Sequence, residues 1–263
     1  MKWEMLLIGL LILMPLQGMH TIAMNTPPFW EGDVVLIKNT TFTVVAESGK
    51  SYTISYTTAL GALDMASKAG NFSYTVSDEW YEQFGSLLIT SIAGKENEGT
   101  NGWQYWVNYP DEPLPWVGAD KYEVKDGDTV DFFYGGFGIT PDTTEMLIRI
   151  HVHVVEDNEV PYIDVVKPKE GGVYIFDREI LKLPSKTAFI IGELTVEAVA
   201  EDELSGIKYV EFYLDGNLQA RINEEPYIWK LQGEAGKHIL EAKAFDNAGN
   251  TAKTERIIWI LPL

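Results

Sequence analysis

Short alternating runs of apolar and polar residues dominate this chain from Thr41 onward, and turn residues rich in Gly, Asn and Asp separate them. This period of two is typical of β-strands with one buried face. The segment "TFTVVAESGKSYTISY", for example, predicts two strands around the turn Glu47–Lys50. Only "TTALGALDMASKAG" has a helical period, with Thr57 or Thr58 as its cap and Gly70 at its end. The pattern predicts a mainly β fold class.

The two halves of the chain differ in their predicted secondary structure. The first combines the single helix with strands, which predicts an α+β domain, whereas the second shows only short strands at the intervals of an all-β sandwich. The segment "NEVP", Asn158 to Pro161, marks the expected boundary. We therefore predict a first domain over 41–157 and a second over 158–263, with residues 24–40 as a linker.

The first 23 residues contain an apolar run from Met5 to Leu16. A run of about twelve residues matches the apolar part of a signal peptide and is shorter than a membrane span. A signal peptide is the favoured interpretation, and an uncleaved N-terminal anchor is the alternative. Both predict an extracellular or cell-surface location, with membrane contact only through this segment if it stays uncleaved.

Charge and cysteine content exclude several kinds of function. The net charge is −19, from 39 acidic and 20 basic residues, so the chain would repel nucleic acid and anionic lipid surfaces. It has no cysteine, which excludes disulfides, thiolate metal sites and a cysteine nucleophile. It also lacks the G-x-S-x-G and H-E-x-x-H motifs, and we expect no enzymatic activity.

Three motifs of the first half occur in a family order: "ALGALDMASKAG", "GTNGWQYWVNY" and "GADKYEVKDGDTVDFFY". They resemble the β-grasp domain at the C-terminus of transcobalamin and intrinsic factor, and its relatives in prokaryotic surface proteins. This resemblance implies a β-grasp fold and one side of a cobalamin cleft. The helical barrel that supplies the other side in the vitamin carriers has no counterpart here, so cobalamin capture would need a partner protein.

The second half carries "KPKEGGVYIFDREI", "DELSGIKYVEFYLDG" and "GKHILEAKAFDNAGN". These segments resemble the immunoglobulin-like modules of prokaryotic, especially archaeal, cell-surface proteins. The resemblance implies a β-sandwich that serves as a stalk, spacer or adhesive unit.

The aromatic segment "GWQYWVNYPDEPLPW" is the candidate binding surface. Alternation places Trp103, Tyr105 and Val107 on one face, which we assign to the core. The opposite face presents an aromatic residue between polar neighbours, and a second tryptophan follows in the next loop, as at stacking and interface sites. The predicted ligand-binding residues are Gln104, Trp106, Asn108 and Trp116.

Metal sites have weaker support. His151 and His153 share a strand face, but no third ligand is adjacent, and Asp126-Gly127-Asp128 is better explained as a hairpin turn. We therefore predict no definite metal site. In the second half, oxygen ligands that suit calcium come from turns that a sandwich would bring to one end: Asp202, Glu203, Asp246, Asn247 and Asn250. Such residues also favour turns for local reasons. Calcium and cobalamin are the two cofactors left open.

Together these features predict an exported, non-enzymatic binding protein. The first domain would present the aromatic surface to a cell-surface component or a small flat ligand, and the second would act as a spacer. The alternatives are a purely structural or adhesive protein, and corrinoid capture together with a partner.

Overall fold

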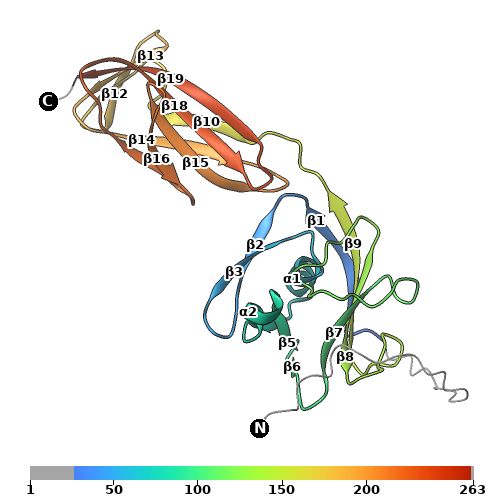
Figure 1. The fold of residues 1–263 in the computed structure, drawn as a ribbon. Helices are drawn as coiled ribbons and strands as arrows, with labels where there is room; N and C mark the ends of the chain where they lie inside the picture. The colour runs from blue at the N-terminus through green and yellow to red at the C-terminus, as the bar shows by residue number, and fades with distance from the viewer. Residues whose placement is uncertain (1–26, 262–263) are drawn as a thin grey trace, which may run out of the picture.

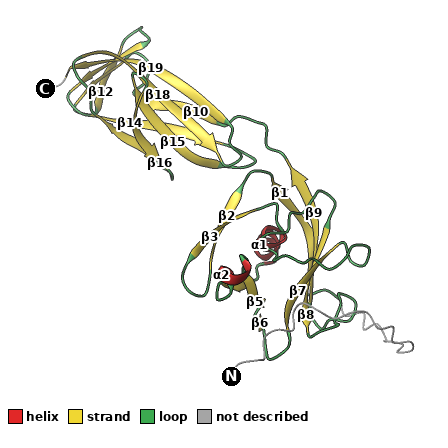
Figure 2. Cartoon of the chain, viewed as in Figure 1, coloured by secondary structure: helices red, strands yellow, loops and turns green. Residues whose placement is uncertain are grey.

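The computed structural model describes residues 27–261, which form two lobes joined by the segment after β9 (Figure 1). Each lobe has its own hydrophobic core: one cluster of buried residues runs from Val34 to Val152, and a second runs from Ile163 to Ile260. The expected boundary at residues 158–161 lies between the two clusters. Strands predominate in both lobes (Figure 2), so the predicted mainly β fold class is confirmed. The predicted signal peptide or anchor, residues 1–23, lies outside the described residues.

The main sheet of the first domain has four strands in the order β1-β9-β8-β7. Strand β1 pairs in parallel with β9, whereas β8 pairs antiparallel with both β9 and β7. The bounds are β1 (Trp30–Ile37), β7 (Gly102–Val107), β8 (Thr129–Gly135) and β9 (Leu147–Val155). Because β1 is the first strand of this domain and β9 the last, their pairing brings the two ends of the domain together in one sheet.

Strand β1 corrects one prediction. Residues 24–40 were expected to be a linker, but Trp30–Ile37 is a strand whose Val34 and Leu36 side chains belong to the core. Val34 pairs with Val152 and Leu36 with Val154. A parallel strand needs a partner that reaches it through a long crossover. The partner, β9, is distant in the sequence, so no local hairpin signal indicated that Trp30–Ile37 is a strand.

Helix α1 (Ala59–Gly70) packs against β1 and β9. The Thr58 side chain accepts a hydrogen bond from the Gly61 amide, which satisfies a free donor of the first turn. Gly61 lets the helix approach the preceding chain, because a Cβ there would lie 2.1 Å from the Tyr56 carbonyl oxygen. The helix was predicted to end at Gly70, and its cap is the next residue, Asn71, in the left-handed conformation.

Smaller elements complete the first domain. Strands β2 (Thr41–Val45) and β3 (Ser51–Ser55) form the predicted hairpin. A three-stranded sheet and a one-turn helix follow α1: β4 (Tyr74–Ser77), α2 (Tyr81–Phe84), β5 (Leu88–Ile92) and β6 (Lys95–Glu96).

The second domain has two sheets around one hydrophobic core. The smaller sheet has the order β10-β14-β17, from β10 (Tyr162–Lys167), β14 (Leu194–Glu201) and β17 (Tyr227–Leu231). The larger has the order β12-β11-β13-β19-β18-β15-β16, from β11 (Gly172–Ile175), β12 (Arg178–Lys182), β13 (Thr187–Ile191), β15 (Ile207–Leu214), β16 (Asn217–Ile222), β18 (Gly236–Asp246) and β19 (Thr251–Leu261). Within residues 27–261, no helix has the length and apolarity that a bilayer crossing requires.

Candidate functional site

Strand β7 sorts its aromatic side chains as the alternation predicts. Trp103 and Val107 are buried in the first core, and Tyr105 packs against it with its ring stacked on Phe132 at 5.8 Å between centroids. Burial raises the pKa of the Tyr105 phenol well above its usual value of 10, so the hydroxyl remains a donor. It donates to the Val117 carbonyl at 2.6 Å. The inner face of β7 is therefore core, and it also holds one end of the loop that follows.

Trp106 lies on the outer face of β7 and is half-buried. Its indole Nε1 donates to the Glu112 carbonyl at 2.7 Å, and its ring meets Tyr109 edge-on at 5.0 Å. Both contacts come from the loop of residues 109–118, which we call the Trp116 loop. Trp106 thus anchors this loop, and its one polar group is already used.

Gln104 and Asn108 also use their side chains within the domain. The Gln104 amide donates to the Gly135 carbonyl at 3.1 Å. Asn108 adopts the left-handed conformation, donates to Asp128 and accepts from the Thr129 amide, both at 2.9 Å. These two predicted ligand-binding residues therefore hold turns in place.

Trp116 is the most exposed of the four predicted residues, with 87% of its surface accessible. Leu114 and Val117, beside it in the chain, are also exposed. Hydrogen bonds hold the Trp116 loop on both sides of Trp116 in the chain, from Trp106 to Glu112 and from Tyr105 to Val117. The structure therefore separates the predicted set into three supporting residues and one exposed tryptophan.

Phe137 is another exposed aromatic residue, and it was not predicted from the sequence as a contact residue. Phe137 is 91% exposed and lies in the loop of residues 136–146, in the segment "YGGFG". This loop reaches the Trp116 loop through a hydrogen bond from the Tyr109 hydroxyl to Asp142 at 3.1 Å. A lone aromatic residue in a glycine-rich loop was the available signal.

An ion pair between a buried carboxylate and a partly exposed guanidinium lies on the outer face next to Trp106. Asp131 is opposite Trp106 on β8, and Arg149 is opposite Asp131 on β9. The carboxylate is 1% exposed and receives two hydrogen bonds of 2.8 Å from the guanidinium. This carboxylate raises the pKa of Arg149, which stays charged.

The two histidines have acidic neighbours from β1. His151 Nε2 lies 3.3 Å from Glu31, and His153 Nε2 lies 2.9 Å from Asp33. The Asp126-Gly127-Asp128 segment is a turn, in which Gly127 has a φ of 87° and Asp128 accepts from the Lys125 amide. It is not the predicted hairpin turn, because β8 pairs with β7 and β9 and not with the segment before the turn. Among residues 27–261, neither feature forms a group of three converging metal ligands.

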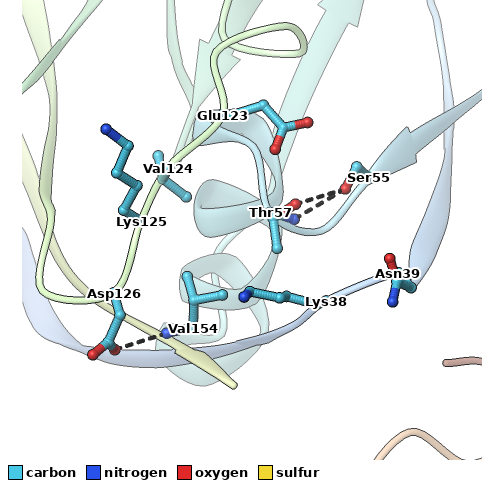
Figure 3. A pocket seen from close by; sticks show the side chains of 9 residues that line it. All are labelled: Lys38, Asn39, Ser55, Thr57, Glu123, Val124, Lys125, Asp126 and Val154. Atoms are coloured by element: carbon cyan, nitrogen blue, oxygen red, sulfur yellow. Dashed lines mark hydrogen bonds between the residues drawn. The ribbon is translucent and has the colours of Figure 1, made fainter. Parts of the chain in front are cut away.

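A depression of about 490 Å³ lies at the end of the first domain where β1 and β9 finish (Figure 3). Lys38, Lys125, Glu123 and Asp126 give it a mixed charge. The hydrogen bonds among its nine lining residues join Ser55 to Thr57 and Asp126 to the Val154 amide. No hydroxyl in this set is held against a base, as nucleophilic catalysis would need.

Two of the proposed calcium ligands, Asp202 and Asp246, converge, and Asp157 from the interdomain segment joins them. One carboxylate oxygen from each lies within 4.8 Å of the others. Asn247 and Asn250 use their amide groups to donate to the Gly206 and Asp157 carbonyls. Glu203 is exposed and is not one of the three converging residues. Asp157 was missed because it was read as the end of the first domain.

Comparison with known families divides the chain in the same way. Residues 57–136 match a family described as Domain of unknown function (DUF4430), which is transcobalamin-like, and residues 181–242 match the family Bacterial Ig domain. A segment of the first half is thus similar to a transcobalamin-like family, and a segment of the second half is similar to bacterial immunoglobulin domains. No curated protein matches the chain.

Solved structures with detectable similarity include fibronectin(III)-like modules of Clostridium thermocellum CbhA, at 21% identity and a TM-score of 0.29, covering 38% of this chain and 96% of that one. A chimeric titin Z1Z2 tandem has 10% identity and a TM-score of 0.24, with coverages of 66% and 89%. Cadherin domains 3–6 of protocadherin gamma B2 have 12% identity and a TM-score of 0.25, with coverages of 89% and 47%.

Proposed function

We propose that this chain is an extracellular, non-enzymatic binding protein whose Trp116 loop contacts a cell-surface component. The immunoglobulin-like domain would act as the spacer that presents the first domain. The exposure of Trp116 on a loop held from both sides carries the proposal.

The Trp116 side chain favours binding because its exposed apolar surface is unfavourably hydrated. Trp side chains bury about 150–250 Å² at contacts. At about 25 cal/mol per Å², covering one gains roughly 4–6 kcal/mol before the costs of association. Exposed tryptophans with apolar neighbours are typical of the residues that dominate binding energy. Leu114 and Val117 supply such neighbours, and the fixed loop lowers the entropy lost on binding.

The family matches support the coarser part of this proposal. Bacterial immunoglobulin domains are typical of extracellular proteins, and the transcobalamin-like module suggests binding or structural work. The sequence lacks the catalytic motifs G-x-S-x-G and H-E-x-x-H, and for this reason we propose a non-enzymatic role.

The test measures how strongly the labelled full chain and its Trp116→Ala variant bind to intact cells of the source organism. We expect saturable binding that Trp116→Ala weakens at least tenfold, because that substitution removes most of the apolar contact. Phe176→Ala is the matched control, since it removes an exposed aromatic side chain from the second domain. Circular dichroism should show both variants folded.

Equal binding by Trp116→Ala and the unchanged chain would refute the role of the loop. No binding by either would favour the structural or adhesive alternative. Equilibrium dialysis with cyanocobalamin tests the third alternative, in which the first domain holds a corrinoid with a partner. If the chain retains cyanocobalamin and Trp116→Ala abolishes this retention, the ligand of the loop would be a small flat molecule and not a cell-surface component.

A further inference from the structure

Three aspartates from three separate segments meet at the end of the immunoglobulin-like domain nearest to the first domain. Asp157 lies in the segment after β9, Asp202 follows β14, and Asp246 ends β18. Their nearest carboxylate oxygens all lie within 4.8 Å of one another. Three carboxylates at this spacing repel each other unless a cation or a proton separates them.

Each aspartate uses one oxygen, Oδ1, to hold its own turn. Asp246 Oδ1 accepts from the Gly249 and Asn250 amides at 2.6 and 2.8 Å. Asp202 Oδ1 accepts from the Ser205 and Gly206 amides at 2.8 and 2.7 Å. Asp157 Oδ1 accepts from the Glu159 amide at 3.1 Å. The turn amides therefore occupy Oδ1 of each carboxylate, and Oδ2 is not used by the turns.

The remaining oxygens are the unusual feature. Asp246 is completely buried and Asp157 is 7% exposed, yet the Oδ2 atom of each has no hydrogen-bond partner within residues 27–261. A buried carboxylate oxygen without a partner is unfavourable by several kcal/mol relative to one in water. Two such oxygens in one acidic cluster indicate that a positively charged ligand completes the site.

We propose that Asp157, Asp202 and Asp246 bind a calcium ion. The cluster offers only oxygen ligands, which suit hard cations, and calcium accepts six to eight of them in irregular geometry. Magnesium requires near-octahedral geometry and gives up its water reluctantly. Carboxylates held by separate turns fit the more tolerant ion, and extracellular fluid supplies it at millimolar levels that match the weak affinity of surface modules.

The ion would fix the interdomain segment to the immunoglobulin-like domain. In the structure a 3.0 Å hydrogen bond from the Asn250 amide to the Asp157 carbonyl contributes to this attachment. The neighbouring residues Asn158, Glu159 and Val160 are exposed. A calcium ion shared by Asp157 and the two loop aspartates makes the position of the first domain depend on calcium.

The full chain, stripped with EGTA, is tested by calorimetric unfolding at increasing calcium concentrations. For a dissociation constant of about 10⁻⁴ to 10⁻³ M, 10 mM calcium should raise the folding constant of the second domain about 10- to 100-fold. Hydrogen exchange of residues 156–160 should slow in parallel, which reports the attachment of the segment itself.

The matched variants are Asp202→Asn with Asp246→Asn, and Glu203→Gln. Asparagine keeps Oδ1 as an acceptor for the turn amides and removes the charge, so the double variant should fold and lose the calcium effect. Glu203→Gln removes one charge from an exposed neighbour outside the cluster and should retain the effect. Isothermal titration of the unchanged chain gives a direct measure of binding should the double variant misfold.

An unchanged transition in calcium, or an equal shift in the double variant, would overturn the proposal. An equal shift with magnesium would overturn the assignment to calcium.

Discussion

Trp106 lies on β7 and Trp116 in the loop that follows it, and their surroundings give the two tryptophans different roles. Trp106 donates its N–H to Glu112 and packs on Tyr109, so it supports the loop. Trp116 is exposed on the loop that Trp106 supports. The polar partner of the indole, rather than its position in the alternation, separates a supporting residue from a contact residue.

The cap of helix α1 gives a prediction at this scale. Thr58→Ala removes the side-chain oxygen that accepts the Gly61 amide, so the first turn loses a hydrogen bond. We expect a loss of about 1 kcal/mol in the free energy of unfolding of the first domain. Urea denaturation measures it, and Thr58→Ser, which keeps the hydroxyl, should recover most of the loss. Equal losses in both variants would show that the methyl group matters instead.

The sequence predicted which side chains share a face of β7 better than it predicted their hydrogen-bond partners. Alternation placed Gln104, Trp106 and Asn108 on the outer face of β7. The backbone groups that bind the side-chain amides of Gln104 and Asn108, however, belong to Gly135 and Thr129, which are distant in the sequence. Asp202 and Asp246 were expected to meet because both lie in turns of one sandwich. Asp157 could not be added, because the path of the chain between the domains is set by tertiary contacts such as Asn250 to Asp157.

At the scale of elements, β1 shows the same limit. Helix α1 and the β2–β3 hairpin have local signals, a cap and a turn, and were predicted close to their observed bounds. Strand β1 has a partner from the other end of the domain, so its alternation had no neighbouring strand to confirm it. Local patterns therefore identified the elements with local contacts.

Leu36 tests whether β1 belongs to the core. Leu36→Ala leaves a cavity under the sheet, because Leu36 is fully buried, and should lower the free energy of unfolding by about 2–5 kcal/mol. Val35→Ala is the matched control on the opposite, exposed face of the same strand and should change it by less than about 1 kcal/mol. Similar midpoints in urea for the two variants would contradict the assignment.

The contact between the β15–β16 turn and β18 predicts a pH dependence. His238 Nδ1 lies 2.6 Å from Asp215 Oδ2, and this hydrogen bond raises the pKa of His238 above 6.5. The Ile239 amide and His238 lower the pKa of Asp215 below 3.8. The pair therefore stabilises the fold most between about pH 4 and 6.5. Its contribution falls at higher pH as folded His238 loses its proton, and at lower pH as folded Asp215 gains one.

His238→Gln should destabilise the second domain by about 1 kcal/mol near pH 5, a value that allows for the exposure of Asp215. The difference from the unchanged chain should shrink above the folded pKa of His238. Thermal unfolding at pH 5 and pH 9 measures it. A difference that is the same at both values would exclude titration of His238 as the cause.

At the scale of the molecule, the two cores have no residue in common. Phe212 is fully buried in the second core, so Phe212→Ala should lower the stability of that domain by about 3–5 kcal/mol. The first domain should keep its transition within error. Calorimetry of the full chain resolves the two, and a joint downward shift of both transitions would show that the domains unfold as one unit.

The parallel pairing of β1 with β9 has a mechanical consequence. Trp30 begins β1 at the same end of the sheet as Leu147 begins β9, and the chain leaves β9 at the opposite end (Figure 1). Tension between the entry and the exit of the first domain therefore acts along both strands in opposite directions. It loads all of their shared hydrogen bonds in shear at once, whereas pulling on a hairpin would open the bonds one after another.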